Sequence, residues 1–415
     1  MTYHIAHEGT TTEAIDDADL WSGNTLNVPA LRATGWRPAP IREFILKLVG
    51  RCNLACRYCY VYTAPDRSWL RRPQLMSAPT LAAASRRIGQ HAAEHGLRRV
   101  RVVLHGGEPL LAGAAGIELA ATAVRRHVPA GVELDLRVQT NGVLLDETVL
   151  RTLHKHRIRV GVSLDGDADS HDRHRVRANG RGSYAETVRG LRLLCRPEHR
   201  DLFAGLLCVV DAGTDPLAVY EELLAYAPPS VDLLLPHGNW SSPPPGRTAD
   251  PTSTPYADWL ITVFDRWYAT SPRQTRVVIF EEVMNLLLGG HSRCEQVGLS
   301  PVAFLVIDTD GTLQQVDTLK SAFPGAPDTG LDVFAHRIDA ALDHPSVAAR
   351  QIGLAALGAT CRGCRIVRVC GGGHYTHRYR HGHGFRQPSV YCADLTALIG
   401  HIRRRLHSDL RRVAS

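Results

Sequence analysis

Between residues 43 and 240, short apolar runs of strand length alternate with longer amphipathic stretches of helical period. The run FILKLVG predicts a first strand, and SAPTLAAASRRIGQHAAEH predicts a helix that Ser77 or Thr80 can cap. Five further strands are predicted in RRVRVVLHGG, VELDLRVQTNG, RVGVSLDG, LFAGLLCVVD and SVDLLLPHGN, with a helix between successive strands. Such alternation implies parallel strands joined by right-handed crossovers. We therefore expect an α/β fold, a partial (β/α)6 TIM-type barrel.

The remaining chain divides by composition. The polar start has no sustained period, so we expect either a poorly ordered arm or an extension that docks substrate. A Pro-, Ser- and Thr-rich stretch follows the last predicted strand, and VAFLVIDTDGTLQQVD predicts a hairpin that turns at AspGly. The predicted domains are a polar arm (1–42), the α/β core (43–240), a linker with bridging helices (241–290), a small cysteine-rich domain (291–395) and a C-terminal helix (396–415).

Composition indicates a globular protein, with 44% hydrophobic and 21% charged residues. No apolar run approaches the 18 or so residues of a membrane span, and the N-terminus lacks a basic segment that leads into an apolar one. We expect a cytoplasmic protein without a membrane partner. The net charge is +7, but three lysines leave arginine to supply most of the positive charge, and the arginines are scattered. A scattered excess does not form the basic face that nucleic acid needs, so we expect no nucleic-acid partner.

Seven of the ten cysteines fall into two groups, which in a cytosolic chain indicates metal binding or catalysis rather than disulfides. The first group is Cys52, Cys56 and Cys59, and the second is Cys361, Cys364, Cys370 and Cys392. Three thiolates leave one iron of a [4Fe–4S] cluster open, although a zinc knuckle with a distant fourth ligand is an alternative. Four thiolates make a closed site, for which spacing alone permits zinc or a [4Fe–4S] cluster. The isolated Cys195 and Cys208 are predicted to be core thiols.

The phrase CNLACRYCY resembles the signature of the radical SAM superfamily, whose open iron is chelated by S-adenosylmethionine. The turns that follow the predicted strands occur in the order that this superfamily shows. The resemblance implies that S-adenosylmethionine contacts three of these turns: the GlyGlyGluPro turn (Gly106, Gly107, Glu108, Pro109), the next turn through Gln139 and Asn141, and the third through Ser163 and Asp165. It also implies contacts with Arg175 and with Tyr58 or Tyr60, which lie beside Cys59.

The second cysteine group resembles the SPASM extension, which carries auxiliary clusters. This chain departs from the full seven-cysteine pattern, because Val316 and His374 stand where two cysteines are expected. The resemblance therefore implies one auxiliary [4Fe–4S] cluster, with Cys294 as a free thiol. In the related sulfatase-maturing enzymes an aspartate follows the missing cysteine and acts as a base, which makes Asp317 the candidate catalytic residue. The alternative is an exposed aspartate at a hairpin end.

The phrases LVGRCNLACRYCYVY, DTDGTLQQVDTLKSA and RVCGGGHYTHRY resemble the FxsB-type peptide maturases. That resemblance implies an enzyme that modifies a small ribosomal precursor peptide, joining an aromatic ring carbon to a β-carbon in a three-residue cyclophane. An electron donor such as flavodoxin or ferredoxin is implied as well. The four histidines between residues 371 and 384 are interpreted as part of a polar loop around the cluster, with a metal site as the alternative.

Two other functions remain open at this point. One is an anaerobic sulfatase-maturing enzyme that forms formylglycine, which shares the architecture. The other is a non-catalytic, metal-stapled binding protein, which the basic charge and the CxxC pair would also fit.

Overall fold

The computed structural model describes residues 26–248 and 250–414, and its centre is one ten-stranded sheet in the order β10-β9-β8-β1-β2-β3-β4-β5-β6-β7. Six neighbouring strands run parallel in chain order, as the apolar runs predict. They are β1 (Glu43–Val49), β2 (Arg99–Gly106), β3 (Glu133–Thr140), β4 (Arg159–Ser163), β5 (Phe203–Val209) and β6 (Ser230–Leu234). The sheet is open, with β10 and β7 (Arg276–Val277) at its two ends.

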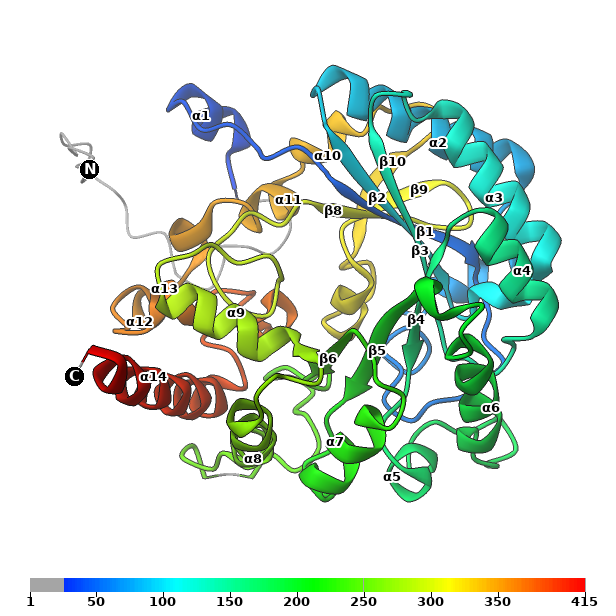
Figure 1. Ribbon diagram of the computed structural model, residues 1–415. Helices are drawn as coiled ribbons and strands as arrows, with labels where there is room; N and C mark the ends of the chain where they lie inside the picture. Colours follow the sequence, from blue (N-terminus) through cyan, green and yellow to red (C-terminus); the bar gives the residue numbers. More distant parts are fainter. Residues whose placement is uncertain (1–25, 249, 415) are drawn as a thin grey trace.

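Helices connect these strands and lie along the outer side of the curved sheet (Figure 1). They are α2 (Ala78–Glu94), α3 (Gly113–His127), α4 (Glu147–Lys155), α5 (Ala168–Asp172), α6 (Tyr184–Leu194) and α7 (Pro216–Leu224). Ser77 caps α2 by accepting a hydrogen bond from the Thr80 amide. Alternate strand residues such as Phe44, Leu46, Val100 and Val102 are fully buried in the core between sheet and helices. This arrangement confirms the predicted α/β fold.

The predicted hairpin forms and also extends the central sheet. Strand β8 (Phe304–Ile307) pairs antiparallel with β9 (Thr312–Gln314), which pairs with β10 (Asp328–Asp332). Strand β8 also pairs parallel with β1. The sequence pattern does not show this last pairing, because about 260 residues separate the two strands. As a result, the segment that follows β9 lies beside the first strand.

The C-terminal segments are mostly helical and flank the sheet at both of its ends, near β10 and near β6 and β7 (Figure 1). They are α8 (Pro255–Ala269), α9 (Val278–Leu287), α10 (Asp339–Leu342), α11 (Pro345–Ala349), α12 (Ala359–Arg362), α13 (Val367–Cys370) and α14 (Cys392–Ala414). The last helix begins at Cys392, earlier than the apolar period suggests, and His401 binds Asp265 of α8 at 2.9 Å. Of the predicted polar arm, residues 1–25 lie outside the described residues, while α1 (Val28–Ala33) and the buried Ile41 belong to it.

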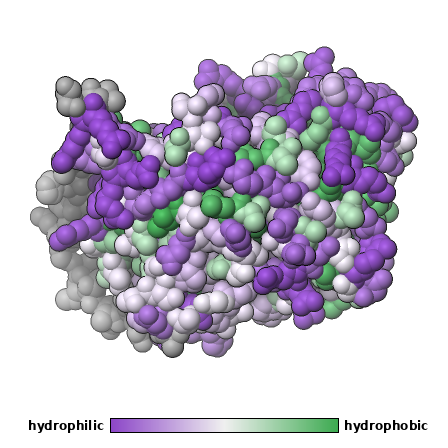
Figure 2. Space-filling view, turned by 60° about the horizontal axis from the view of Figure 1, so that its bottom comes forward, coloured by the Kyte–Doolittle hydropathy of each residue, from purple (hydrophilic) through white to green (hydrophobic). Residues whose placement is uncertain are grey.

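Surface composition agrees with a globular chain. On the face shown in Figure 2, hydrophilic side chains predominate and hydrophobic ones form small groups. Among the described residues, none of the helices combines the length and the apolar composition needed to cross a bilayer.

Candidate functional site

The first cysteine group lies in the loop that follows β1, at the carboxyl end of the parallel strands. Two backbone hydrogen bonds hold this loop against the segment near Arg175, from the Ala55 amide to the Val176 carbonyl at 2.7 Å and from the Arg57 amide to the His174 carbonyl at 3.0 Å. All three cysteines are free. Burial raises the pKa of Cys52 to about 12 and that of Cys56 to about 11, so these thiols need a nearby cation to become thiolates.

The GlyGlyGluPro turn packs against this loop closely enough to require glycine. A Cβ atom on Gly106 would collide with the Val49 carbonyl, and one on Gly107 would collide with the Arg51 carbonyl and the Tyr62 hydroxyl. Gly106 also has a φ of +140°, which side chains rarely adopt. The two glycines therefore let the end of β2 contact the cysteine loop directly.

Glu108 connects this turn with the next one. Its fully buried carboxylate accepts hydrogen bonds from the Thr140 hydroxyl at 2.7 Å and the Asn141 amide at 2.8 Å. Burial raises the pKa of Glu108 to about 7, against the effect of these hydrogen bonds. The carboxylate thus points into the protein and holds the ends of β2 and β3 together.

Tyr58, Asp165 and Arg175 converge on one another. The Tyr58 hydroxyl donates to Asp165, and Arg175 Nε donates to the same carboxylate oxygen at 2.9 Å. The other carboxylate oxygen of Asp165 accepts from the Val209 amide at 3.0 Å. Burial raises the pKa of Tyr58 well above its usual value, so the phenol stays protonated and acts as a donor.

The remaining predicted contacts lie at the same edge of the sheet. Gln139 Nε2 donates to the Ser163 hydroxyl at 3.0 Å, which links the ends of β3 and β4. Asn141 Nδ2 donates to Asn53 Oδ1 at 2.8 Å and lies 3.8 Å from the Cys52 sulfur. The structure therefore brings the predicted turns and the first cysteine group to one end of the barrel.

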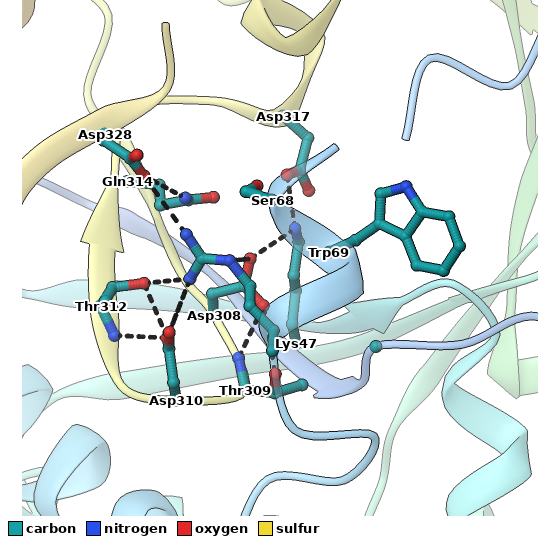
Figure 3. A network of polar contacts seen from close by, with 12 residues as sticks. Lys47, Ser68, Trp69, Asp308, Thr309, Asp310, Thr312, Gln314, Asp317 and Asp328 are labelled. Atoms are coloured by element: carbon teal, nitrogen blue, oxygen red, sulfur yellow. Dashed lines mark hydrogen bonds and ion pairs between the residues drawn. The ribbon is translucent and has the colours of Figure 1, made fainter. Parts of the chain in front are cut away.

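Asp317 is buried, so the exposed hairpin alternative is wrong. It begins the short helix η4 (Asp317–Ser321), and its Oδ1 lies 2.5 Å from Lys47 Nζ (Figure 3). Burial is the main reason that the pKa values of Cys59 and Tyr60 are raised, and the negative charge of Asp317 raises both further. Asp317 therefore lies near the cysteine loop. The carboxylate thus lies inside the site.

Lys47 is the residue that sequence reasoning missed. It lies on β1, is 3% exposed, and also contacts Asp308 Oδ2 at 3.0 Å. Burial lowers the pKa of Lys47, but the Asp317 and Asp308 carboxylates outweigh this effect and raise it above its usual value. The signal in the sequence was a lysine inside an apolar strand, in a chain with three lysines.

The second cysteine group forms a separate pocket. Cys361, Cys364, Cys370 and Cys392 line it together, although they come from α12, α13, α14 and the turn between α12 and α13. Burial raises the pKa of Cys370 to about 11. Cys294 lines a different cavity, beside Glu295 and Arg378. Cys208 lies in the hydrophobic core, as predicted, whereas Cys195 is only partly buried and packs against that core.

Both donor sets fit iron–sulfur clusters. Each consists of free thiols gathered by the fold, and the raised pKa values of Cys52 and Cys370 are ones that a bound metal would lower. The first offers three sulfurs beside polar side chains, and the second offers four sulfurs in one pocket.

Comparison with known proteins agrees with this geometry. The family model described as the radical SAM superfamily matches residues 46–201. The serine-type anaerobic sulfatase-maturating enzyme of Klebsiella aerogenes is 27% identical over 364 residues, 85% of each chain. The cysteine-type enzyme of Clostridium perfringens is 26% identical over 306 residues, which cover 67% of this chain and 74% of that protein.

Solved structures show the same fold. The enzyme anSMEcpe with bound AdoMet and a peptide superposes with a TM-score of 0.75 at 21% identity, covering 89% of this chain and 99% of that one. Streptococcus suis SuiB bound to its precursor peptide SuiA gives a TM-score of 0.56 at 14% identity, covering 87% and 78%. The chain thus has the radical SAM α/β fold, and it is an enzyme that uses S-adenosylmethionine, a [4Fe–4S] cluster and an auxiliary cluster.

Proposed function

We propose that this enzyme modifies a small ribosomally made precursor peptide, forming a carbon–carbon bond between an aromatic ring and a β-carbon to give a three-residue cyclophane. The observation that carries the proposal is the buried Asp317–Lys47 pair beside the cysteine loop. It adds a proton acceptor to a site whose other residues suit radical chemistry. The peptide-bound solved structures with this fold support a peptide as substrate.

In this proposal Cys52, Cys56 and Cys59 hold the catalytic cluster, and the turns around them hold S-adenosylmethionine. When bound, the cluster and S-adenosylmethionine would supply the radical that abstracts a hydrogen atom from an unactivated carbon. The protein contributes side chains that hydrogen bonds hold in fixed positions. Glu108 locks the ends of β2 and β3, and the buried Asp165 fixes Tyr58 and Arg175, so neither residue has to reorganise when the cofactor binds.

Asp317 would accept the proton that the aromatic ring loses. Closing the ring system removes two hydrogens from the peptide, one as an atom and the other as a proton plus an electron. The pKa of Lys47 is raised, and its protonated Nζ, 2.5 Å from Asp317 Oδ1, orients that carboxylate. The proton thus has an acceptor inside the barrel.

Cys361, Cys364, Cys370 and Cys392 would hold the auxiliary cluster, which would supply an acceptor for that electron. Four sulfurs leave no open position for a substrate, so this site suits electron transfer. A flavodoxin or ferredoxin would serve as the external electron donor for the first cluster.

The second candidate function is formation of formylglycine in a sulfatase. The observation that favours it is similarity to two sulfatase-maturating enzymes, one of which matches over 85% of both chains. The same base could take the proton from the serine or cysteine that is oxidised.

One experiment separates the two functions. The reconstituted enzyme is incubated with a short precursor peptide that carries a ring-deuterated aromatic residue, and with a sulfatase-derived serine peptide. A cyclophane loses one ring deuterium and does not react with an aldehyde-capturing hydrazide. Formylglycine retains all ring deuterium and gains the mass of the hydrazide. Hydrazide capture on the sulfatase peptide alone would contradict the cyclophane proposal.

A further inference from the structure

Three histidines from distant parts of the chain share one buried site. His237 follows β6, while His374 and His377 lie in the loop after Cys370. Their potential ligand nitrogens all lie within 4.8 Å of one another. We propose that His237, His374 and His377 bind a divalent ion of the zinc type. This site is separate from both cysteine groups and goes beyond the proposed function.

One distance matches an edge of a tetrahedral metal site. Ligands 2.0–2.1 Å from a tetrahedral zinc ion lie about 3.3 Å from one another. His377 Nε2 and His237 Nδ1 are 3.3 Å apart. A nitrogen of His374 lies within 4.8 Å of both, so rotation of that side chain would complete a three-histidine site.

The surrounding residues orient the ligand atoms. Arg350 holds Glu295 Oε1 at 2.8 Å, which leaves Oε2 facing His374. His374 Nδ1 accepts a hydrogen bond from the Thr376 amide at 3.3 Å, so the ring keeps its proton on Nε2 and faces Glu295 Oε2 with it. Glu295 thus holds the ring as a carboxylate outside a metal shell does, and the lone pair that a metal would take is that of Nδ1.

The site lies between the two cysteine groups. The His237 ring is 4.9 Å from that of Tyr60, which follows Cys59, and the His377 ring is 4.9 Å from that of Tyr391, which precedes Cys392. An ion here would join the end of β6 to the C-terminal segment and fix the two cysteine groups relative to each other.

The test uses the full chain with both clusters reconstituted, so that neither cysteine group is left to take up zinc. One equivalent of Zn²⁺ is added, the protein is desalted, and metal content and the zinc X-ray absorption edge are measured. We expect about one zinc per chain with nitrogen and oxygen neighbours at about 2.0–2.1 Å and no sulfur. Loss of zinc on desalting, or sulfur neighbours at about 2.3 Å, would overturn the proposal.

Variants localise the site. His237→Gln and His377→Gln should weaken zinc binding by more than the roughly 10- to 100-fold that outer contacts are worth. His381→Gln is the matched control, because His381 lies in the same loop but is exposed. Iron content should stay unchanged in all three variants. Wild-type zinc retention by His377→Gln would refute the assignment, and if a variant fails to fold, the absorption result on the wild-type protein decides.

Discussion

The two cysteine groups differ in what surrounds them. The loop after β1 carries three thiols among charged and polar side chains, including the Tyr58–Asp165–Arg175 cluster and the nearby Asp317. The C-terminal pocket carries four thiols, and its other lining residues are apolar or small and uncharged. A cluster held by three thiolates has an open position, so with polar side chains around it the site can bind and orient a substrate. A cluster held by four thiolates has no open position and only holds its metal. In our proposal this difference assigns the chemistry to the first site and electron transfer to the second.

Removing each set of thiols is expected to have the largest effect and tests directly whether the two cysteine groups have different roles. Replacing Cys52, Cys56 and Cys59 with Ala should abolish reductive cleavage of S-adenosylmethionine while about four irons remain bound. Replacing the four C-terminal cysteines should remove those irons and leave cleavage in place. Iron analysis and chromatography of 5′-deoxyadenosine measure both effects. Substantial 5′-deoxyadenosine from the first variant would show that the sites are misassigned.

The polar side of the first site can be tested through Asp317→Asn. The amide keeps the size of the side chain but cannot accept the proton, and Lys47 keeps Asp308 as a partner, so the fold should persist. Cross-linked product should fall by roughly 10²–10⁴-fold while 5′-deoxyadenosine still forms with peptide present. Mass spectrometry of both products gives the ratio.

Asp308→Asn is the matched control for that experiment, because it removes the other carboxylate from the same lysine. It should retain most of the product. An Asp317→Asn enzyme with near-normal product would instead assign Asp317 a purely structural role.

The barrel site should also show a pH-dependent stability that the cysteine pocket lacks. Burial, followed by the charge of Arg175, lowers the pKa of His171 to about 4, against about 6.5 in the unfolded chain. The folded state thus favours neutral His171. Its stabilisation is present above pH 6.5 and is lost as the pH falls from 6.5 through 4. At 1.36 kcal/mol per pH unit the full loss is on the order of 3 kcal/mol, with about 2 kcal/mol between pH 7 and 5.

Urea unfolding of the wild type and of His171→Gln at pH 7 and pH 5 measures this contribution. The variant should lose less unfolding free energy on acidification than the wild type. Equal losses in both proteins would mean that His171 does not titrate in this window.

The smallest effect is expected at Cys294, which belongs to neither group. It lines a cavity with Glu295 and Arg378 and not the four-cysteine pocket. Cys294→Ala should leave the iron content unchanged, and so should His374→Ala, which in our proposal loses zinc instead. A loss of about four irons in either variant would reveal a further cluster that neither donor set accounts for.

The sequence alone determined the elements whose information is local. Strand and helix alternation, the order of the turns and the spacing of the cysteines are all encoded within short segments, so periodicity and motif spacing predicted them. The parallel order of β1 to β6 also followed, because each crossover joins neighbours in the chain.

Only the tertiary structure decided the contacts between distant segments. Lys47 meets Asp317 across 270 residues, β8 joins β1, and His237 approaches His377 across 140 residues. No local period reports such pairs, because they depend on how whole elements pack. From the sequence alone, a lysine within a strand such as Lys47 is expected to lie at the surface, because its buried acidic partner, Asp317, is not known. The fold therefore supplied the charge environment of the site, which the motifs could not.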